Sequence, residues 1–401
     1  MPDVPVEFLL FALTLAGVAA AHHRALEVAA TGLVTIASYK VFASPFDEGA
    51  GLSGLGAHFL HEGVTLANLA GLLLGFALLS RHFEESRLPQ VLPRWLPGDW
   101  RGAFVMLVMV FVLSSFLDNI AAAMIGGAMA HSLFRSVHVG YLAGIVAASN
   151  AGGSGSVVGD TTTTMMWIEG VSPMAVLHAY VAAGAALVVC GIPAALQQHR
   201  HAPMRQLISD RIDIDWGRVA IVLCILVAAI LANVVVNTRY PAYAQAFPIL
   251  AGAVWATLLV TTGFRRPDWK VLPESVKGTV FLLCLVSSAS MMPVERLPPP
   301  SWQTSFVLGL VSAVFDNIPL TALALQQGGY DWGMLAYAVG FGGSMLWFGS
   351  SAGVAISSFY PQARSVVGWV RGGWHVAVAY VVGFFVLLAV LGWQPAPSGP
   401  H

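Results

Sequence analysis

The sequence predicts an all-α protein that crosses a membrane many times, and three observations support this fold class. Charged residues are 10% and hydrophobic residues 57% of the 401 residues, whereas about 25% of residues are charged in soluble proteins. Apolar runs of about 20 residues recur along the chain, which is the length that crosses the hydrocarbon of a bilayer. Segments rich in glycine and polar residues also interrupt some of these runs at membrane depth.

The composition also argues against several other classes of protein. The net charge is −1 and the sequence has no cluster of Lys and Arg, so nothing indicates nucleic-acid binding. Cys190, Cys224 and Cys284 lie inside apolar runs, where cysteine is typical as a small packing residue. The first apolar run begins at Val6 without a basic segment or a cleavage pattern, so we interpret it as a membrane helix and not as a signal peptide.

Complete crossings are expected where an apolar run is long and uninterrupted. These runs are Val6–Ala21, Ala25–Phe42, Phe59–Ser80, Pro173–Leu196, Gly217–Val236, Pro241–Thr262, Ser275–Met292 and Gly372–Leu391. Two pairs of shorter runs flank polar tips, at Asp118-Asn119 and at Asp316-Asn317. Because each short run cannot reach across the hydrocarbon, we expect two re-entrant hairpins, over residues 102–134 and 304–326.

Two further apolar regions, residues 139–168 and 332–360, are interrupted near their middle. The first contains Ala148–Thr164, which is rich in glycine and hydroxyl side chains, and the second contains Gly340–Ser351. In hydrocarbon every backbone N–H and C=O group needs a partner, so an interrupted helix persists only where protein or a polar cavity surrounds it. Discontinuous helices of this kind form the ion and substrate sites of many secondary transporters. We therefore expect two broken helices that together form a binding site.

The two halves of the chain match motif by motif. The tip Asp118-Asn119-Ile120 is repeated as Asp316-Asn317-Ile318. The triplet Gly152-Gly153-Ser154 is repeated as Gly342-Gly343-Ser344, and in each half another glycine follows after four intervening residues. The expected organisation is N-terminal membrane helices (1–58), a first repeat (59–196), linker and scaffold helices (197–274), a second repeat (275–391) and a tail (392–401).

The distribution of basic residues predicts the orientation of these repeats. Cytoplasmic loops of membrane proteins are enriched in Lys and Arg. With both termini outside and each hairpin returning to its own side, only Lys40, Arg239 and Arg296 of the 19 Lys and Arg residues lie outside. This topology has about ten crossings, and its hairpins enter from opposite sides. We therefore expect inverted repeats, which are characteristic of alternating access.

Three carboxylates, Asp118, Asp160 and Asp316, lie at predicted membrane depth. An aspartate at the centre of a membrane helix costs about 2.5–3.5 kcal/mol, so each needs a physical reason. One reason is capping of a helix N-terminus, where Asp is favoured. The other is ion binding, because oxygen ligands suit a hard cation such as Na⁺. A carboxylate that loses its cation can take up a proton, which is sufficient chemistry for antiport.

The predicted ion- and proton-binding residues share oxygen-bearing side chains. They are Asp118, Asn119, Ser149, Asn150, Ser154, Ser156, Asp160, Thr161, Thr162, Asp316, Asn317, Ser344, Ser350 and Ser351, with the three aspartates as the expected Na⁺ ligands. The glycines expected to permit the helix breaks are Gly152, Gly153, Gly159, Gly342, Gly343 and Gly349. The halves are chemically asymmetric, because Ser350 occupies the position that Asp160 has in the first half.

These motifs resemble the NhaD-type Na⁺/H⁺ antiporters of the ion transporter superfamily, which also includes arsenite and dicarboxylate carriers. The resemblance is carried by the hairpin tips and by Asn150-Ala151-Gly152-Gly153, Gly159-Asp160 and Gly342-Gly343-Ser344-Met345-Leu346. It implies Na⁺ or Li⁺ exchanged for H⁺ without a cofactor. It also implies a homodimer in lipid, which we place in a prokaryotic plasma membrane, with a part that moves like an elevator. The functional residues it implies are Asp118, Asn150, Asp160, Thr162 and Asp316.

Two alternatives remain open at this stage. A carrier of a small anion, such as a dicarboxylate or arsenite coupled to Na⁺ or H⁺, is disfavoured because two anionic tips repel an anion. An intramembrane aspartyl protease using Asp118 and Asp160 would leave the repeated tip at Asp316 unexplained. We therefore expect a transporter and not an enzyme.

Overall fold

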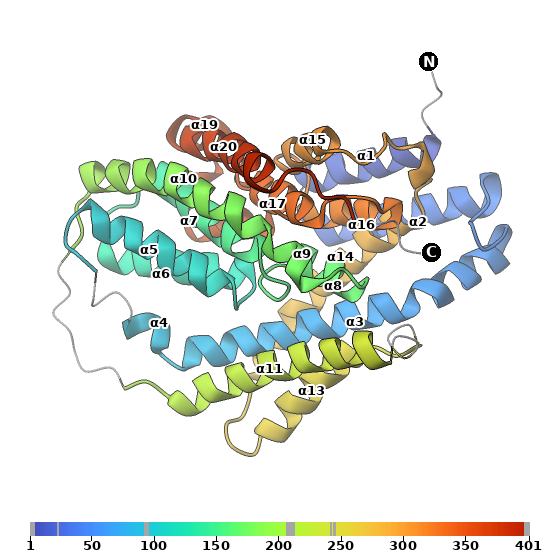
Figure 1. Ribbon diagram of the computed structural model, residues 1–401, viewed down its shortest axis with the longest axis horizontal. Helices are drawn as coiled ribbons and strands as arrows, with labels where there is room; N and C mark the ends of the chain where they lie inside the picture. The colour runs from blue at the N-terminus through green and yellow to red at the C-terminus, as the bar shows by residue number, and fades with distance from the viewer. Residues whose placement is uncertain are drawn as a thin grey trace.

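The computed structural model describes residues 5–21, 24–91, 96–205, 213–240, 243 and 246–396 (Figure 1). Within these ranges the regular structure is helical, and the only strand-like pairing is an isolated bridge between Phe46 and Gly49. The prediction of an all-helical fold is confirmed. The start of the expected crossing Pro241–Thr262 and residues 397–401 of the expected tail lie outside the described residues.

The N-terminal part forms three long helices and a short one. They are α1 (Val6–Ala20), α2 (Ala25–Ala43), α3 (Gly51–Glu85) and α4 (Leu88–Val91). With 35 residues, α3 is much longer than the apolar run from which it was predicted. The predicted division between residues 58 and 59 therefore falls inside this helix. There the His58 ring bonds to Glu48 and to the Ser290 hydroxyl, which ties α3 to the end of a later helix.

A helical hairpin and an interrupted helix follow. Their elements are α5 (Trp100–Ser114), α6 (Asn119–Leu133), α7 (Val139–Ser154), α8 (Thr161–Ile168), α9 (Pro173–Leu177) and α10 (Ala179–His201). The α5 and α6 helices contact each other and both contact α7. The turn between α5 and α6 is at residues 115–118, where the sequence places the first polar tip.

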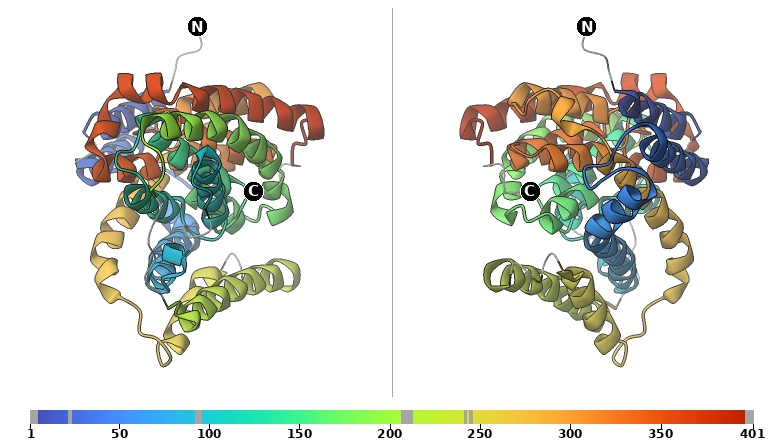
Figure 2. Two further views of the ribbon diagram at one scale, coloured as in Figure 1. Left: turned by 90° about the vertical axis from the view of Figure 1, so that its left-hand side faces the viewer. Right: turned by 90° about the vertical axis from the view of Figure 1, so that its right-hand side faces the viewer.

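In the middle of the chain, two helices pack beside α3, and a third contacts α2 and the later helix α16 (Asn317–Gln327) as well as α3. This part comprises α11 (Trp216–Arg239), α13 (Ile249–Thr261), η3 (Trp269–Val271) and α14 (Leu272–Ser290). Both α11 and α13 contact α3, and Figure 2 shows them at one end of the molecule. Ion pairs join the ends of these elements: Arg81 with Asp268 at 3.1 Å, and Arg218 with Glu85 at 2.8 Å.

The basic residues of these ion pairs are among those that the predicted topology places on the cytoplasmic side. Arg81 and Arg218 both line a cavity at this end of the helices. Arg94 and Arg211, which the same topology assigns to this side, lie outside the described residues. The orientation of this end in a membrane stays a prediction.

The last part repeats the hairpin and the interrupted helix. Its elements are η4 (Val294–Arg296), α15 (Trp302–Ser312), α16 (Asn317–Gln327), α17 (Trp332–Gly342), α18 (Ser351–Phe359), η5 (Pro361–Arg364), α19 (Val366–Gly372) and α20 (Trp374–Leu391). The α15 and α16 helices contact α17, as α5 and α6 contact α7. The two interrupted helices also contact each other, through α7 with α17 and with α18.

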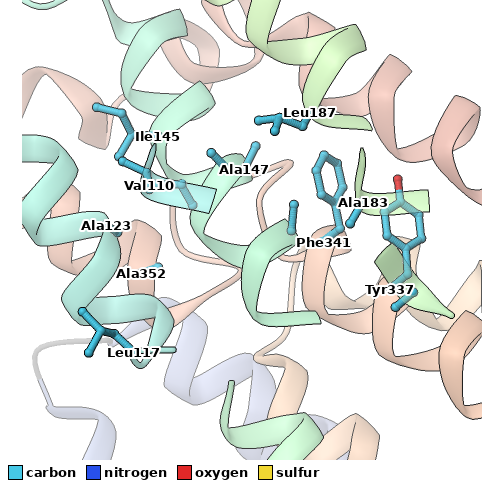
Figure 3. Packing of buried hydrophobic residues seen from close by; sticks show 14 of the residues in the cluster. Val110, Leu117, Ala123, Ile145, Ala147, Ala183, Leu187, Tyr337, Phe341 and Ala352 are labelled. Atoms are coloured by element: carbon cyan, nitrogen blue, oxygen red, sulfur yellow. The ribbon is translucent and has the colours of Figure 1, made fainter. Parts of the chain in front are cut away.

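The core of the molecule lies around α7 and α17. Every residue of α17 is buried, as is every residue of α7 after Val139. Figure 3 shows side chains of these two helices, such as Ala147 and Phe341, packed with Val110 and Leu187 of the helices around them. Because α7 and α17 have no exposed face, the polar segments at which they end are also enclosed by protein.

The outer helices present apolar side chains at the surface. Large hydrophobic residues such as Leu13, Phe42, Leu60 and Val260 are exposed. Five helical segments in the described ranges are long and apolar enough to cross a membrane: Ala25–Ala43, Gly51–Glu85, Pro173–His201, Trp269–Ser290 and Trp374–Leu391. An apolar surface of this kind suits lipid, while the interrupted helices lie inside it.

Candidate functional site: a buried carboxylate where two helix breaks meet

Two helix breaks form the frame of the candidate site. In the first half, α7 ends at Ser154 and α8 begins at Thr161; in the second, α17 ends at Gly342 and α18 begins at Ser351. Each break folds back on its own backbone. A Cβ atom at Gly153 would lie 2.7 Å from the Gly159 carbonyl oxygen, and one at Gly343 would lie 2.6 Å from that of Gly349. Both distances are too short for a side chain, so these positions require glycine.

Other glycines hold the breaks against the hairpins. A Cβ atom at Gly152 would collide with the backbone of Phe111 in α5, and one at Gly342 with the backbone of Gly309 in α15. The Phe111 and Gly309 positions match each other in the two hairpins. Backbone therefore packs directly on backbone at corresponding places in the two halves.

Asp118 and Asp316 act as helix N-caps at the hairpin tips. The Asp118 carboxylate accepts a hydrogen bond from the Ile120 N–H at 3.2 Å, and Asp316 accepts one from the Ile318 N–H at 3.0 Å. Their backbone angles are nearly identical, with φ −52° and ψ 141° for Asp118 and φ −54° and ψ 142° for Asp316. Both residues are partly exposed. Asp316 also accepts a hydrogen bond from the Ser351 hydroxyl at 3.3 Å.

The residue after each of these caps, Asn119 or Asn317, points into the protein instead. Asn119 is 5% exposed and Asn317 is 3% exposed. The Asn119 amide donates to Asp160 Oδ1 at 3.3 Å, and the Asn317 amide donates to Asp160 Oδ2 at 3.4 Å. Amides from both hairpin tips therefore reach the two oxygens of one carboxylate.

Asp160 is the centre of this arrangement. It caps α8, and its carboxylate accepts hydrogen bonds from the Thr162 N–H at 3.4 Å and the Thr162 hydroxyl at 3.0 Å. It is 3% exposed, and Asp118 and Asp316 each directly precede an asparagine that bonds to it. Among the described residues none of the ion pairs includes Asp160. A buried carboxylate without a cationic partner is costly to keep ionised, so this group favours either a bound cation or a proton.

Asn150 joins the two halves beside this carboxylate. Its Oδ1 atom accepts a hydrogen bond from the Asn119 amide at 3.1 Å. Its own amide donates to the hydroxyls of Ser344 at 2.9 Å and Ser350 at 3.0 Å. Since the side chains of Asn150, Ser344 and Ser350 are almost completely buried, this network is shielded from solvent.

The other predicted site residues lie farther from the Asp160 carboxylate in the hydrogen-bond network. The Ser149 hydroxyl donates to the Asn119 carbonyl at 3.0 Å, and the Ser154 hydroxyl donates to the Ala151 carbonyl at 2.9 Å. The Ser156 hydroxyl accepts from the Val158 N–H at 3.3 Å within the break. Thr161 is buried at the start of α8.

Several residues that support the break were not predicted from the sequence. Thr163 and Thr164 both donate to the Asp160 carbonyl at 2.9 Å, which locks the first turn of α8. The Tyr180 hydroxyl of α10 and the Ser115 hydroxyl both donate to the Gly152 carbonyl at 3.2 Å. The run of four threonines could have indicated the first pair. Tyr180 lies in an ordinary apolar run, and nothing in its sequence context distinguishes it.

The three aspartates do not form one compact set of ligands. Across the described ranges, no group of three or more His, Cys, Asp and Glu side chains is placed to hold a metal ion. The side-chain groups that bond to the Asp160 carboxylate are the amides of Asn119 and Asn317 and the Thr162 hydroxyl, and the other two aspartates lie at the hairpin tips. A cation with modest demands on ligand charge suits this set better than a divalent ion.

The fold and the site define an integral membrane protein with an enclosed polar centre, the arrangement found in solute transporters. The chain belongs to the CitMHS family of citrate transporters, whose sequence model matches residues 8–342.

Individual relatives are similar over most of the chain. Sodium/proton antiporter 1 of Arabidopsis thaliana is 26% identical over 363 residues, which cover 80% of this chain and 60% of the relative. The Na⁺/H⁺ antiporter NhaD of Halomonas elongata is 26% identical over 400 residues, covering 81% of this chain and 76% of the relative. NhaD of Vibrio parahaemolyticus is 25% identical over 351 residues, covering 74% of this chain and 83% of the relative.

These comparisons confirm the resemblance to NhaD-type antiporters. The family and the named relatives are transporters and not enzymes, which removes the protease alternative. The chain spans 60% of the length of the first Arabidopsis relative.

Proposed function

We propose that the protein exchanges Na⁺ or Li⁺ for H⁺, with Asp160 as the carboxylate that binds the cation and the proton in turn. The observation that carries this proposal is the pair of hydrogen bonds from Asn119 and Asn317 to the two oxygens of Asp160. Because both bonds come from hairpin tips, movement of either hairpin alters the environment of the carboxylate. Cation and proton compete for the same oxygens, and this competition couples their movements in opposite directions.

The proposed mechanism is alternating access by two inverted repeats, residues 59–196 and 275–391. Support comes from the matched caps at Asp118 and Asp316 and from the matched breaks in α7–α8 and α17–α18. The proposed topology has about ten crossings and two hairpins that enter from opposite sides, with both termini outside. The family resemblance adds an elevator-like movement, a homodimer in lipid and a prokaryotic plasma membrane to this proposal.

The family description favours a second candidate, a carrier of citrate, and the sequence left open a carrier of another small anion, a dicarboxylate or arsenite. In that case Na⁺ or H⁺ would neutralise Asp160 before the anion entered. Antiport of cations is the better fit, because a carboxylate at the centre of a buried site repels an anion.

A flux experiment separates these candidates. The purified full chain is placed in proteoliposomes containing a pH-sensitive dye, and Na⁺, Li⁺, K⁺, citrate and succinate are added in turn outside. We expect Na⁺ or Li⁺ to move protons in the opposite direction, whereas the anions have no effect. Proton movement that follows citrate or succinate, with none caused by cations alone, would contradict the proposal.

Substitution of the hairpin-tip aspartates tests whether their charge contributes to cation binding. Asparagine caps a helix about as well as aspartate, so Asp118→Asn and Asp316→Asn should leave the tips folded. Removing a nearby negative charge weakens attraction for the cation, and we expect the half-saturating Na⁺ concentration to rise about tenfold. Asp99→Asn is the matched control, because Asp99 caps α5 through the Arg101 N–H and is exposed. Equal effects at all three positions would exclude a specific role for the tips.

A further inference from the structure

The helices that lead into the two breaks, α7 and α17, differ at one position near Asp160. Aligning Gly152-Gly153-Ser154 with Gly342-Gly343-Ser344 pairs Asn150 with Gly340. Asn150 uses its side chain for three hydrogen bonds, whereas Gly340 has no side chain to offer. The hairpin-tip asparagines, Asn119 and Asn317, are the same in both halves, so only one of them meets an asparagine in its own break.

This difference changes where the two tip asparagines donate. Asn119 donates to two acceptors, Asn150 Oδ1 at 3.1 Å and Asp160 Oδ1 at 3.3 Å. For Asn317 the equivalent of the first acceptor would be a side chain at residue 340. Asn317 lacks that acceptor. Like Asn119 it donates to Asp160, in its case to Oδ2 at 3.4 Å and across the boundary between the halves.

Gly340 is also close to the carboxylate itself. A Cβ atom at residue 340 would lie 3.4 Å from Asp160 Oδ2 and 3.3 Å from the Ser154 Cβ. The first distance is an ordinary van der Waals contact, and the second requires a small shift. A longer polar side chain at this position would therefore meet the oxygen to which Asn317 and Thr162 donate.

We propose that Gly340 is a positioning residue, whose missing side chain leaves the space beside Asp160 Oδ2 open to the Asn317 amide. One carboxylate then receives an amide from each hairpin, and the two halves share a single charged centre. A side chain at residue 340 that is longer than that of alanine would extend into this space. It would displace the Asn317 amide from Asp160 Oδ2. This inference rests on the proposed function of Asp160 as the cation-binding group.

The test compares three substitutions whose side chains differ in length and therefore in how far they extend toward Asp160 Oδ2. In proteoliposome flux with Na⁺, Gly340→Asn is expected to raise the half-saturating concentration about tenfold, because one hydrogen bond to a charged group is lost. Gly340→Ser, with a shorter side chain, should act in the same direction but more weakly. Gly340→Ala adds only a Cβ atom and should change the value by less than about threefold. Gly184→Ala is the control, because a Cβ atom there meets nothing within 4 Å.

A double-variant cycle separates positioning from simple bulk. If residue 340 acts through Asn317, Gly340→Asn should have little further effect in an Asn317→Ala background. An equally large effect in that background overturns the inference, and so does a Gly340→Ala effect as large as that of Gly340→Ser. Should Gly340→Asn fail to fold, the Ser and Ala variants make the same comparison. A parent protein without cation-dependent proton flux would refute the proposed function itself, whereas an active parent with unaffected variants would refute only the role of Gly340.

Discussion

Asp160→Asn is expected to abolish cation-dependent proton transport, with flux falling at least about 100-fold. Asparagine has almost the same shape and can still cap α8 through the Thr162 N–H. It carries no charge to attract a cation and no proton to exchange. Its amide nitrogen also replaces one of the two carboxylate oxygens, so that a donor then faces either Asn119 or Asn317. Flux of Na⁺ and H⁺ in proteoliposomes measures the loss directly.

A stability measurement must accompany the Asp160→Asn flux assay. Burying a neutral amide costs less than burying a charge, so the variant should unfold in detergent at a temperature no lower than the parent. Asp99→Asn, at an exposed helix cap, should keep full flux. If Asp160→Asn retained more than about a tenth of the parental flux, another group would have to bind the cation.

The sequence predicted the polar tips but not which residue of each pair would enter the site. The prediction placed both residues of each tip in the site, with Asp118 and Asp316 as Na⁺ ligands and helix capping as the other reason for each aspartate. In the structure these aspartates are N-caps, and an N-cap side chain turns back toward the N–H groups of its own helix. The following residue begins the helix, and in each hairpin that residue, Asn119 or Asn317, is buried. The strong capping preference of aspartate could have indicated that the aspartate caps the helix and the asparagine enters the site. That both asparagines donate to Asp160 could not be predicted, because the contact depends on the tertiary fold.

Contacts between the two halves depend on the tertiary fold. The bonds from Asn150 to Ser344 and Ser350 join residues about 200 positions apart. Sequence motifs identified both partners as polar residues at helix breaks, yet no local pattern says which of them meet. The length of α3 was underestimated for a different reason. Hydropathy marks the part of a helix that suits lipid, whereas α3 begins with a glycine-rich segment and ends with charged residues.

Gly152→Ala is expected to have the second large effect, on stability more than on ion selectivity. The added methyl group would collide with the backbone of Phe111, and backbone within α5 cannot move away without opening the hairpin. Overpacking against a fixed neighbour costs about 1–3 kcal/mol or more, so we expect the unfolding temperature in detergent to fall clearly. Gly342→Ala, which meets the Gly309 backbone in the second half, should show a similar loss.

Gly184→Ala provides the contrasting result that makes the Gly152→Ala experiment decisive. This glycine lies inside α10, and a Cβ atom there meets nothing within 4 Å. Alanine in a helix interior is favoured over glycine by about 0.5–1 kcal/mol, so this variant should be as stable as the parent or more stable. If Gly152→Ala and Gly184→Ala unfolded at the same temperature, close packing of the break on the hairpin would not be what holds the site together. The shared geometry of the two breaks would then have to arise from their hydrogen bonds alone.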